Sequence, residues 1–195
     1  EPKGMGSTID CFFLTPSEEA EESLRRFTFS GQGTCSVGWG HDAFVVIGVA
    51  PWPSDLEGRR DDDLDHADPR WPNTCERCGY VFQPEDQWQH NFTRLYVRSD
   101  NGEKTTLSEA PVGAMWDANW LKDIDSVASP DGRVIVVKTP GGDWNVDSTA
   151  VGGGGWSRTG EVPKITVTPS ILIGRGPEGQ WTYHGWLRDG QLVEC

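Results

Sequence analysis

The feature that most constrains the fold is the segment Cys75-Glu76-Arg77-Cys78-Gly79, in which two cysteines are three residues apart and a glycine follows. A C-x-x-C turn of this kind places two thiolates on one metal ion, and a structural Zn²⁺ is bound by four ligands in tetrahedral geometry. The segment therefore supplies half of a zinc knuckle, and two further ligands have to come from elsewhere in the chain.

The two missing ligands are predicted upstream, in a glycine-rich stretch over residues 33–41. Cys35 and His41 lie there with five residues between them. Together with the C-x-x-C pair they predict a Cys₃His zinc site made of Cys35, His41, Cys75 and Cys78. His66, nine residues before the C-x-x-C pair in an acidic run, is a rival for the histidine position and ranks below His41.

Two other uses of the C-x-x-C pair remain open, a redox dithiol and a disulfide. A redox motif usually opens a helix after a strand, whereas residues 79–82 read as the start of a strand, which favours the metal. Cys11 lies in an apolar run and is expected to be a small buried hydrophobe, and Cys195 a free terminal thiol. Five cysteines are an odd number, which does not match a secreted disulfide framework and favours a reducing compartment.

The length of 195 residues suits one domain, with a part at 7–82 that carries the knuckle and a part at 91–195 built from β-hairpins. Ten tryptophans and 24 glycines favour short strands, tight turns and large aromatic anchors over long helices. The expected fold class is α+β and β-rich, with antiparallel hairpins around one core, one or two short helices and the zinc knuckle.

Three hairpins are predicted from turn residues between strand-forming segments. The paired segments are 92–98 with 104–107 around Asn101-Gly102, 133–139 with 144–147, and 180–187 with 191–193. Residues 164–168 read as a further strand and residues 43–49 as a buried core strand. Gly152 to Gly155 read as a flexible loop or a trimmed insertion.

Helices are predicted at two places. Thr15-Pro16-Ser17-Glu18 resembles a capping box with proline at the first helical position, which predicts a surface helix up to Phe27. Residues 114–121 are the second helix candidate. The proline-rich segment 51–74, with the acidic run 61–68, is expected to be an exposed loop, because a run of this composition cannot bury itself. Its carboxylates could hold Ca²⁺ or Mg²⁺, but their spacing lacks the pattern of a calcium-binding loop.

The formal charge of −13 argues against wrapping a nucleic-acid backbone, because that affinity comes mainly from Lys and Arg. A protein partner is expected in preference to nucleic acid. No apolar run approaches the roughly 20 residues that span a membrane, and no signal peptide is expected. The sequence does not determine the oligomeric state.

No established catalytic motif occurs in the sequence. The weak catalytic alternative is His184 with Asp147 or Asp143, an acid/base couple if two hairpins pair. The favoured interpretation is that His184 is packed on a sheet face beside Trp186. A tryptophan platform for a glycan or a nucleobase is a second alternative to core packing; its members are Trp116, Trp120, Trp144, Trp181 and Trp186.

Five segments have a distinctive sequence: 69–80, with Pro69-Arg70-Trp71-Pro72 before the C-x-x-C pair, and 95–103, 110–117, 139–147 and 183–187. Together these segments resemble an uncharacterised family of small tailed-phage and prophage proteins. The resemblance covers most of residues 7–193, and departs over 148–160, where relatives have a longer polar insertion in place of the glycine run. It implies a viral origin and carries no known activity.

These observations favour a phage-encoded, zinc-stabilised binding or assembly module without catalytic activity, associated with the virion or with a host component. The expected location is the host cytoplasm or the virion. The alternative is a small hydrolase or transferase that acts on a nucleotide, nucleic-acid or glycan substrate. The two readings differ in whether His184 and Asp147 converge in a cleft.

Overall fold

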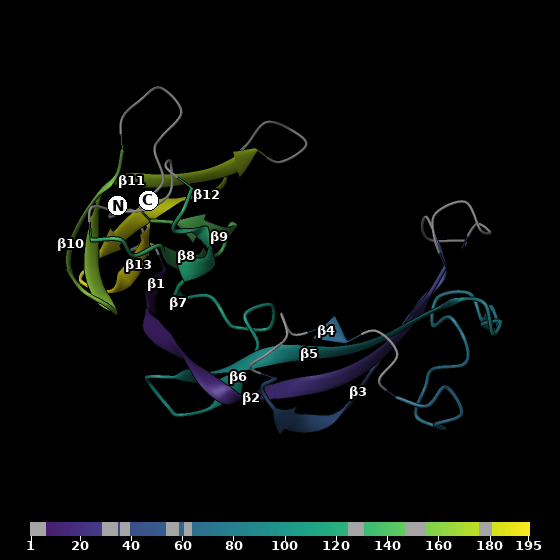
Figure 1. Cartoon of the computed structure of the whole chain (residues 1–195). Coiled ribbons are helices and arrows are strands. Elements are labelled where there is room, and N and C mark those ends of the chain that lie inside the picture. The colour runs from purple at the N-terminus through teal and green to yellow at the C-terminus, as the bar shows by residue number, and fades with distance from the viewer. Residues whose placement is uncertain are drawn as a thin grey trace. The chain divides into compact units, whose positions relative to one another are not determined.

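The computed structural model describes residues 7–28, 35, 40–53, 59–60, 64–124, 131–146, 155–175 and 181–195. Over these residues the chain is built almost entirely from β-strands, and the described helical structure is one 3₁₀ turn, η1 (Asn119–Leu121). Two sheets contain the strands (Figure 1). The β-rich, antiparallel part of the expected fold class is therefore confirmed.

The first sheet has five antiparallel strands. Their spatial order is β1 (Thr8–Asp10), β13 (Gln191–Glu194), β12 (Trp181–Arg188), β11 (Lys164–Arg175) and β10 (Ser157–Glu161). The inward side chains of this sheet alternate with outward ones, as the period of a strand requires. On β12, for example, Tyr183 and Leu187 are buried while Thr182 and His184 are exposed.

The second sheet contains the longest described strand, β2 (Phe12–Phe27), with 16 residues. Its main order is β4 (Arg59–Arg60), β5 (Gln87–Arg98), β2, β7 (Ala114–Asp117), β8 (Ile135–Thr139) and β9 (Gly142–Asn145), with β3 (Asp42–Pro51) paired to β2 and β6 (Lys104–Thr105) paired to β5. The β2–β7 pair is parallel, through Phe12 opposite Ala114 and Phe13 opposite Met115.

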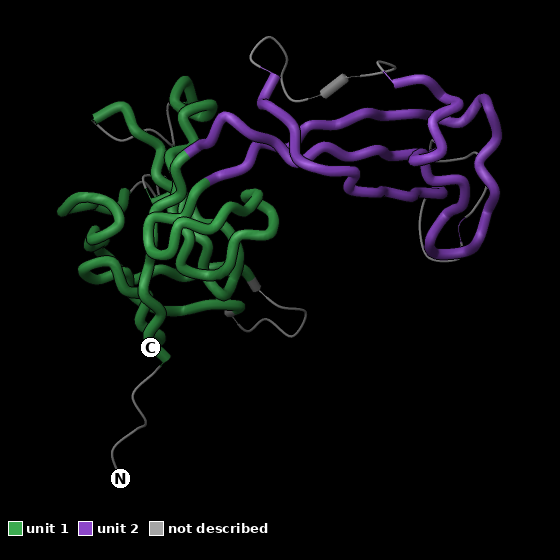
Figure 2. The backbone as a smooth tube through the Cα atoms, turned by 90° about the horizontal axis from the view of Figure 1, so that it is seen from below, with its two compact units in different colours: residues 1–15, 97–195 green, residues 16–96 purple. Residues whose placement is uncertain are grey.

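The chain divides into two compact units (Figure 2). Unit 1 is formed by residues 1–15 and 97–195, and unit 2 by residues 16–96. Unit 1 contains the largest apolar cluster, to which the two sheets both contribute: Met115, Ile135, Val137, Trp144, Val146, Ile165, Val167, Ile171, Tyr183, Leu187 and Leu192. The expectation of one domain with parts at 7–82 and 91–195 stays a prediction.

The three predicted hairpins are present. At the first, Gly102 has φ +75° and its N–H donates to the Arg98 carbonyl over 3.0 Å. The second is tighter than expected, because Thr139 pairs with Gly142 across the turn. In the third, Asp189 and Gly190 both have positive φ. Positive φ at both central residues is typical of the two-residue turns that join hairpin strands. Strand 164–168 is also present, within the longer β11.

The predicted helix over 15–27 is wrong, because these residues belong to β2. β2 pairs with β3 from Glu19 opposite Pro51 to Phe27 opposite Asp42. Of the glutamates that the helix placed in solvent, Glu22 instead meets His90 of β5 at 2.7 Å, whereas Glu18 stays exposed and lies 3.4 Å from Arg94. Long-range strand pairing therefore overrides a local start signal for a helix, as tertiary context often does.

The predicted helix over 114–121 is also wrong. Residues 114–117 form β7, and only 119–121 make a 3₁₀ turn. Met115 lies between β2 and β8 in the sheet, opposite Phe13 and Val137. The run of consecutive buried residues from Ala114 to Trp116 is the pattern of a strand covered on both faces rather than of a helix.

The predicted strand over 43–49 forms as β3, but it is not a core strand. Phe44, Val46 and Val49 are 45%, 49% and 63% exposed. The unbroken run of apolar, mostly β-branched residues in this segment predicts a core strand. Ala43, near the start of the strand, is 3% exposed, so β3 is enclosed in part rather than as a core strand.

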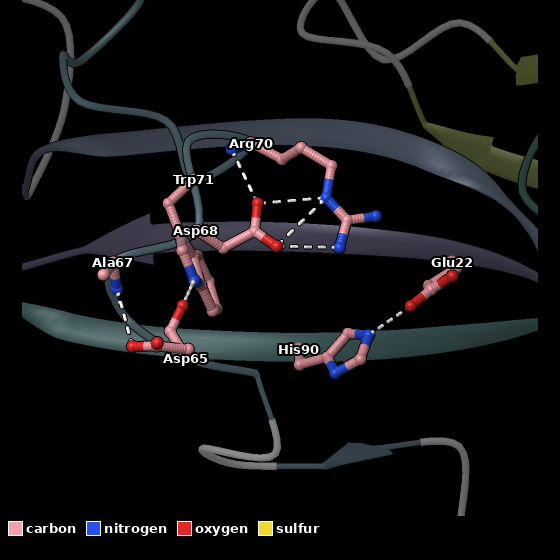
Figure 3. A network of polar contacts seen from close by, with 7 residues as sticks. All are labelled: Glu22, Asp65, Ala67, Asp68, Arg70, Trp71 and His90. Atoms are coloured by element: carbon pink, nitrogen blue, oxygen red, sulfur yellow. Dashed lines mark hydrogen bonds and ion pairs between the residues drawn. The ribbon is translucent and has the colours of Figure 1, made fainter.

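The loop between β4 and β5 is partly packed, whereas the sequence predicted an exposed loop. Asp61, Asp62 and Asp63 lie outside the described residues. Asp65 and His66 are exposed, but Trp71 is 2% exposed and donates its indole N–H to the Asp65 carbonyl over 3.1 Å (Figure 3). The loop is therefore fixed by a buried aromatic anchor.

A neighbouring ion pair fixes the same turn. The Arg70 guanidinium forks onto the Asp68 carboxylate, with N–O distances of 3.0 and 2.8 Å, and the Arg70 backbone N–H donates to it as well (Figure 3). These hydrogen bonds lower the pKa of Asp68 to about 2, and those from the Arg70 side chain have the largest effect.

The buried anchor can be tested with Trp71→Ala, using Trp120→Ala as the matched control. Replacing a buried tryptophan should lower the free energy of unfolding by about 3 kcal/mol. Trp120 is 55% exposed on η1, so its replacement should change that free energy by less than about 0.5 kcal/mol. Urea unfolding followed by far-UV circular dichroism measures both. Equal effects of the two substitutions would show that the loop is not packed.

Candidate metal centre

The structure brings Cys35, His41, Cys75 and Cys78 together. One ligand atom from each residue lies within 4.8 Å of the ligand atoms of all the others. All four residues belong to unit 2. They come from three places in the chain. Cys35 is an isolated bridge residue, His41 directly precedes β3, and Cys75 and Cys78 lie in the turn that follows Trp71.

The C-x-x-C turn is closed by backbone hydrogen bonds. The Cys75 N–H donates to the Tyr80 carbonyl over 2.8 Å, and the Gly79 N–H donates to the Cys75 carbonyl over 2.9 Å. A β-bridge between Thr74 and Val81 holds the two ends of the turn together. Gly79 has φ +74°, a conformation that glycine adopts at little cost and L-residues rarely adopt. This accounts for the glycine after the second cysteine.

His41 is placed by both its backbone and its ring. Its N–H donates to the Thr28 hydroxyl over 2.9 Å, and its carbonyl accepts from the Thr28 N–H over 3.0 Å. The imidazole stacks on the Tyr80 ring, with centroids 3.9 Å apart and planes 6° apart. Its Nδ1 then lies 3.2 Å from the Cys78 sulfur. The end of β2 and the knuckle turn therefore hold the histidine from two sides.

The measured distances suit one ion bound by all four residues. In a tetrahedral site with metal–sulfur bonds of about 2.3 Å, two sulfurs are about 3.8 Å apart and a sulfur and a nitrogen about 3.6 Å apart. The Cys35 and Cys75 sulfurs are 4.0 Å apart, and the His41 Nδ1 and Cys78 sulfur are 3.2 Å apart. All five cysteines are free thiols. The residues present therefore fit a metal ion.

The backbone of the site favours thiolate at Cys75. Burial raises the pKa of this thiol, but N–H groups of Asp42, Arg77 and Cys78 donate to its sulfur, and together they lower the pKa to about 6. Cys78 behaves differently. The Tyr80 N–H lowers its pKa, while local desolvation and the neighbouring thiols of Cys35 and Cys75 outweigh that effect and raise the pKa of this exposed thiol. A cation among the sulfurs would remove this repulsion.

Aromatic side chains surround the site. The small cluster around it consists of Cys35, Ala43, Cys75 and Phe82, with Tyr80 packed against it. Tyr80 also directs its hydroxyl to Asp86 at 3.3 Å. The Arg26 guanidinium lies 5.1 Å from the Phe82 ring and 3.6 Å from the Trp88 ring. The ligands are therefore held in a largely buried, aromatic setting.

The rival histidine, His66, is not in the cluster. Its ring stacks on Trp88 with centroids 4.1 Å apart and planes 5° apart. The Arg26 guanidinium also lies 3.6 Å from the Trp88 ring. Among the described residues, His41 is the histidine that lies with the three cysteines.

The two remaining cysteines lie in unit 1, apart from the cluster. Cys11 is half-buried against the apolar core of that unit, and burial, the largest influence, raises the pKa of its thiol to about 12. It acts as a small apolar side chain at ordinary pH, as its sequence context suggested. Cys195 is exposed.

The weak catalytic alternative gains no support from the described residues. His184 was expected on a packed face, but it is exposed on the outer face of β12, opposite Leu172. Asp143 is exposed on β9, and no hydrogen bond or ion pair of the described part of the chain joins it to His184. Asp147 lies outside the described residues.

The tryptophans do not form one platform in the described part of the structure. Trp116 and Trp144 are buried, and Trp144 meets Trp156 edge to face. The Arg188 guanidinium lies 4.4 Å from the half-buried Trp186 ring. The side chain of Trp181 lies outside the described set, and only Trp120 of the remaining candidates is exposed.

One buried polar pair was not predicted from the sequence. The His90 Nε2 is 2.7 Å from a Glu22 carboxylate oxygen, joining β5 to β2 (Figure 3). The nitrogen on the other side of the ring, Nδ1, is buried and has no hydrogen-bond partner. The two residues are 68 positions apart in the sequence, so only the strand pairing reveals their contact.

No protein-family model, curated protein or solved structure matches the chain. Within the described residues, no helix has the length and apolar character needed to cross a membrane. The description of the site therefore depends on the geometry of these residues alone. That geometry defines a β-rich protein with a buried Cys₃His cluster that fits a metal ion.

The role of Gly79 gives a direct test of the turn. A Cβ on this residue would meet nothing within 4 Å, so Gly79→Ala should cost only the strain of a positive φ, about 1 kcal/mol of unfolding free energy. Gly155→Ala is the control, because its Cβ also meets nothing and its φ is not in the positive region. Chemical unfolding should separate the two variants; an unaffected Gly79→Ala protein would contradict the turn geometry.

Proposed function

We propose that this chain is a zinc-stabilised binding or assembly module without catalytic activity, encoded by a phage, and that it acts on a protein partner in the virion or the host cytoplasm. The observation that carries the proposal is the clustering of Cys35, His41, Cys75 and Cys78. A site with four protein ligands leaves no open position for substrate, which is typical of structural zinc.

The chemistry of the four ligands favours zinc. Three sulfurs and one imidazole nitrogen are soft and borderline ligands, whereas Ca²⁺ and Mg²⁺ take oxygen. A tetrahedral set of sulfur and nitrogen ligands is the usual environment of Zn²⁺. The lowered pKa of Cys75 and the burial of three of the four residues suit an ion bound without water. The metal would contribute directly to the folding of unit 2.

The kind of partner is inferred from charge and from resemblance. A net charge of −13 disfavours contact with a phosphate backbone, so a protein surface is the better match. The resemblance to small tailed-phage and prophage proteins favours a partner that is a component of the virion or of the host. Co-purification of the tagged chain with phage particles, or with one host protein, tests this part of the proposal. A chain that associates with neither would contradict it.

The metal part of the proposal predicts about one Zn per chain by elemental analysis. Removal of the metal with a strong chelator should lower the melting temperature, because a structural ion is part of the folded state. Cys75→Ser and Cys78→Ser should each lose the metal. Cys195→Ser, a change at an exposed thiol outside the cluster, should retain it. A metal-free protein that melts at the same temperature with and without chelator would refute the site.

The charge argument predicts no binding to plain duplex DNA at roughly 0.15 M salt, where the Debye length is about 8 Å. A gel-shift titration measures this directly. Tight binding that weakens steeply with added salt would reveal a basic face hidden in the net charge, and would move the proposal from a protein partner to nucleic acid.

A further inference from the structure

The four ligand residues of the candidate metal centre differ in exposure. Cys35, His41 and Cys75 are buried, whereas Cys78 is exposed. The shell of side chains around a metal site controls the access of solvent to it, and among the described residues this shell leaves one ligand residue open. A small solute therefore meets Cys78 in the folded protein before it meets the other three ligands.

The exposed cysteine has a second thiol beside it in the same turn. Cys75 and Cys78 have the C-x-x-C spacing, and their sulfurs lie within 4.8 Å of each other. A disulfide brings two sulfurs to about 2.0 Å, and C-x-x-C is the spacing of the dithiols of many redox proteins. The bridge between Thr74 and Val81 holds the ends of the turn, so a disulfide here needs no second segment to move.

The other three cysteines are poorer partners for Cys78. Cys35 lies in the cluster, but it is 40 residues before Cys75, so a bond to it would need two segments to approach each other. Cys11 and Cys195 belong to unit 1 and lie outside the cluster. Because Cys195 is exposed, it is an internal control for the oxidation of an accessible thiol that binds no metal.

We propose that the turn of Cys75 and Cys78 is a redox switch for the metal centre, in which a peroxide converts the two ligand thiolates to a disulfide and the Zn²⁺ ion is released. The switch rests on the zinc site proposed above and specifies how that site is regulated. It also gives the C-x-x-C pair both of the uses that its sequence left open, since the reduced pair binds metal and the oxidised pair does not.

The chemistry proceeds in two steps. Metal-bound cysteines are deprotonated, and the thiolate is the nucleophile. The Cys78 sulfur attacks one oxygen of hydrogen peroxide, so that a sulfur–oxygen bond forms, the oxygen–oxygen bond breaks and hydroxide leaves. The Cys75 sulfur then attacks the sulfur of this sulfenic acid, which forms the disulfide and expels a second hydroxide. Both hydroxides take protons from solvent. Two thiolates thus lose two electrons, and one peroxide is reduced to two waters.

The disulfide removes half of the ligand set. Cys35 and His41 remain, and two ligands do not complete the four-coordinate site of a structural zinc. Loss of the ion also removes the cross-link between separate segments of unit 2, to which the metal would contribute folding energy. The new disulfide closes a loop of only a few residues, and a short loop restrains the unfolded chain little. Oxidation should therefore destabilise unit 2 although it adds a covalent bond.

The zinc-loaded, full-length chain treated with hydrogen peroxide tests the switch. A colorimetric zinc chelator should report the release of about one Zn per chain. Alkylation of the remaining thiols followed by peptide mass mapping should place a disulfide between Cys75 and Cys78. The oxidised protein should melt at a lower temperature, and reduction by a dithiol with added Zn²⁺ should restore the original melting temperature.

The outcomes separate the switch from the zinc site itself. A protein that is purified with zinc and keeps it, while peroxide oxidises Cys195, would overturn the switch and leave the proposed zinc module standing. Zinc release with a disulfide from Cys35, or with sulfinic acid at Cys78 and no disulfide, would refute the assigned pair. A protein that binds no zinc before peroxide is added would contradict the proposed function, and the switch with it.

Two variants locate the reactive sulfur. Cys78→His offers a Cys₂His₂ set, a common structural zinc site, without the exposed thiolate. Once its zinc content is confirmed, its release of zinc by peroxide should be at least about tenfold slower, because imidazole does not form a disulfide. Cys195→Ser is the control and should release zinc at the rate of the unmodified chain. Equal rates for the zinc-loaded Cys78→His variant and the unmodified chain would show that attack begins elsewhere. If Cys78→His does not hold zinc, the disulfide map of the unmodified chain decides.

Discussion

The backbone pairing of β2 is the interaction on which the rest of the structure depends. Its first residues pair with β7 in unit 1, and its later residues pair with β3 in unit 2. The residue directly after it, Thr28, fixes His41 with hydrogen bonds to both its N–H and its carbonyl. The ladder between β2 and β3 ends at Phe27 and Asp42, so the strand register itself delivers His41 to the cysteines. A slip of one residue would turn the side chains of β2 to the opposite faces and remove this alignment.

The ligand set was predictable because each member carries a chemical signal that does not depend on the fold. Two thiols at C-x-x-C spacing and a following glycine define a local turn, and Gly79 does take the positive φ that this turn requires. Cys35 and His41 were found by elimination among few cysteines and histidines. The residues that orient them were not predictable, since threonine and tyrosine have no such signal. Thr28 and Tyr80 act only through contacts that the tertiary structure creates.

The two wrong helices and the misplaced core strand share one cause. Local patterns report what a segment prefers alone, whereas a sheet is decided by partners far away in the sequence. In β2 the glutamates suited a helix start, yet Glu22 gains a histidine partner 68 residues away. In β3 a continuous apolar run predicted burial, yet Phe44, Val46 and Val49 are 45%, 49% and 63% exposed. The hairpins were predicted well because a turn such as Asn101-Gly102 specifies its own pairing over a few residues.

The small size of the apolar cluster in unit 2 is a reason for the protein to retain a bound metal ion. Among the described residues, the buried apolar cluster around the candidate metal centre consists of Cys35, Ala43, Cys75 and Phe82, with Tyr80 packed against it, and two of these residues are candidate ligands. Little apolar area is available there to offset the entropy of ordering three separate segments of the chain. Coordinate bonds to one ion would cross-link residues 35 to 78 and supply the stability that so small a cluster lacks. In that arrangement the ion would also order the start of β3, because Ala43 packs in the same cluster as Cys35 and Cys75.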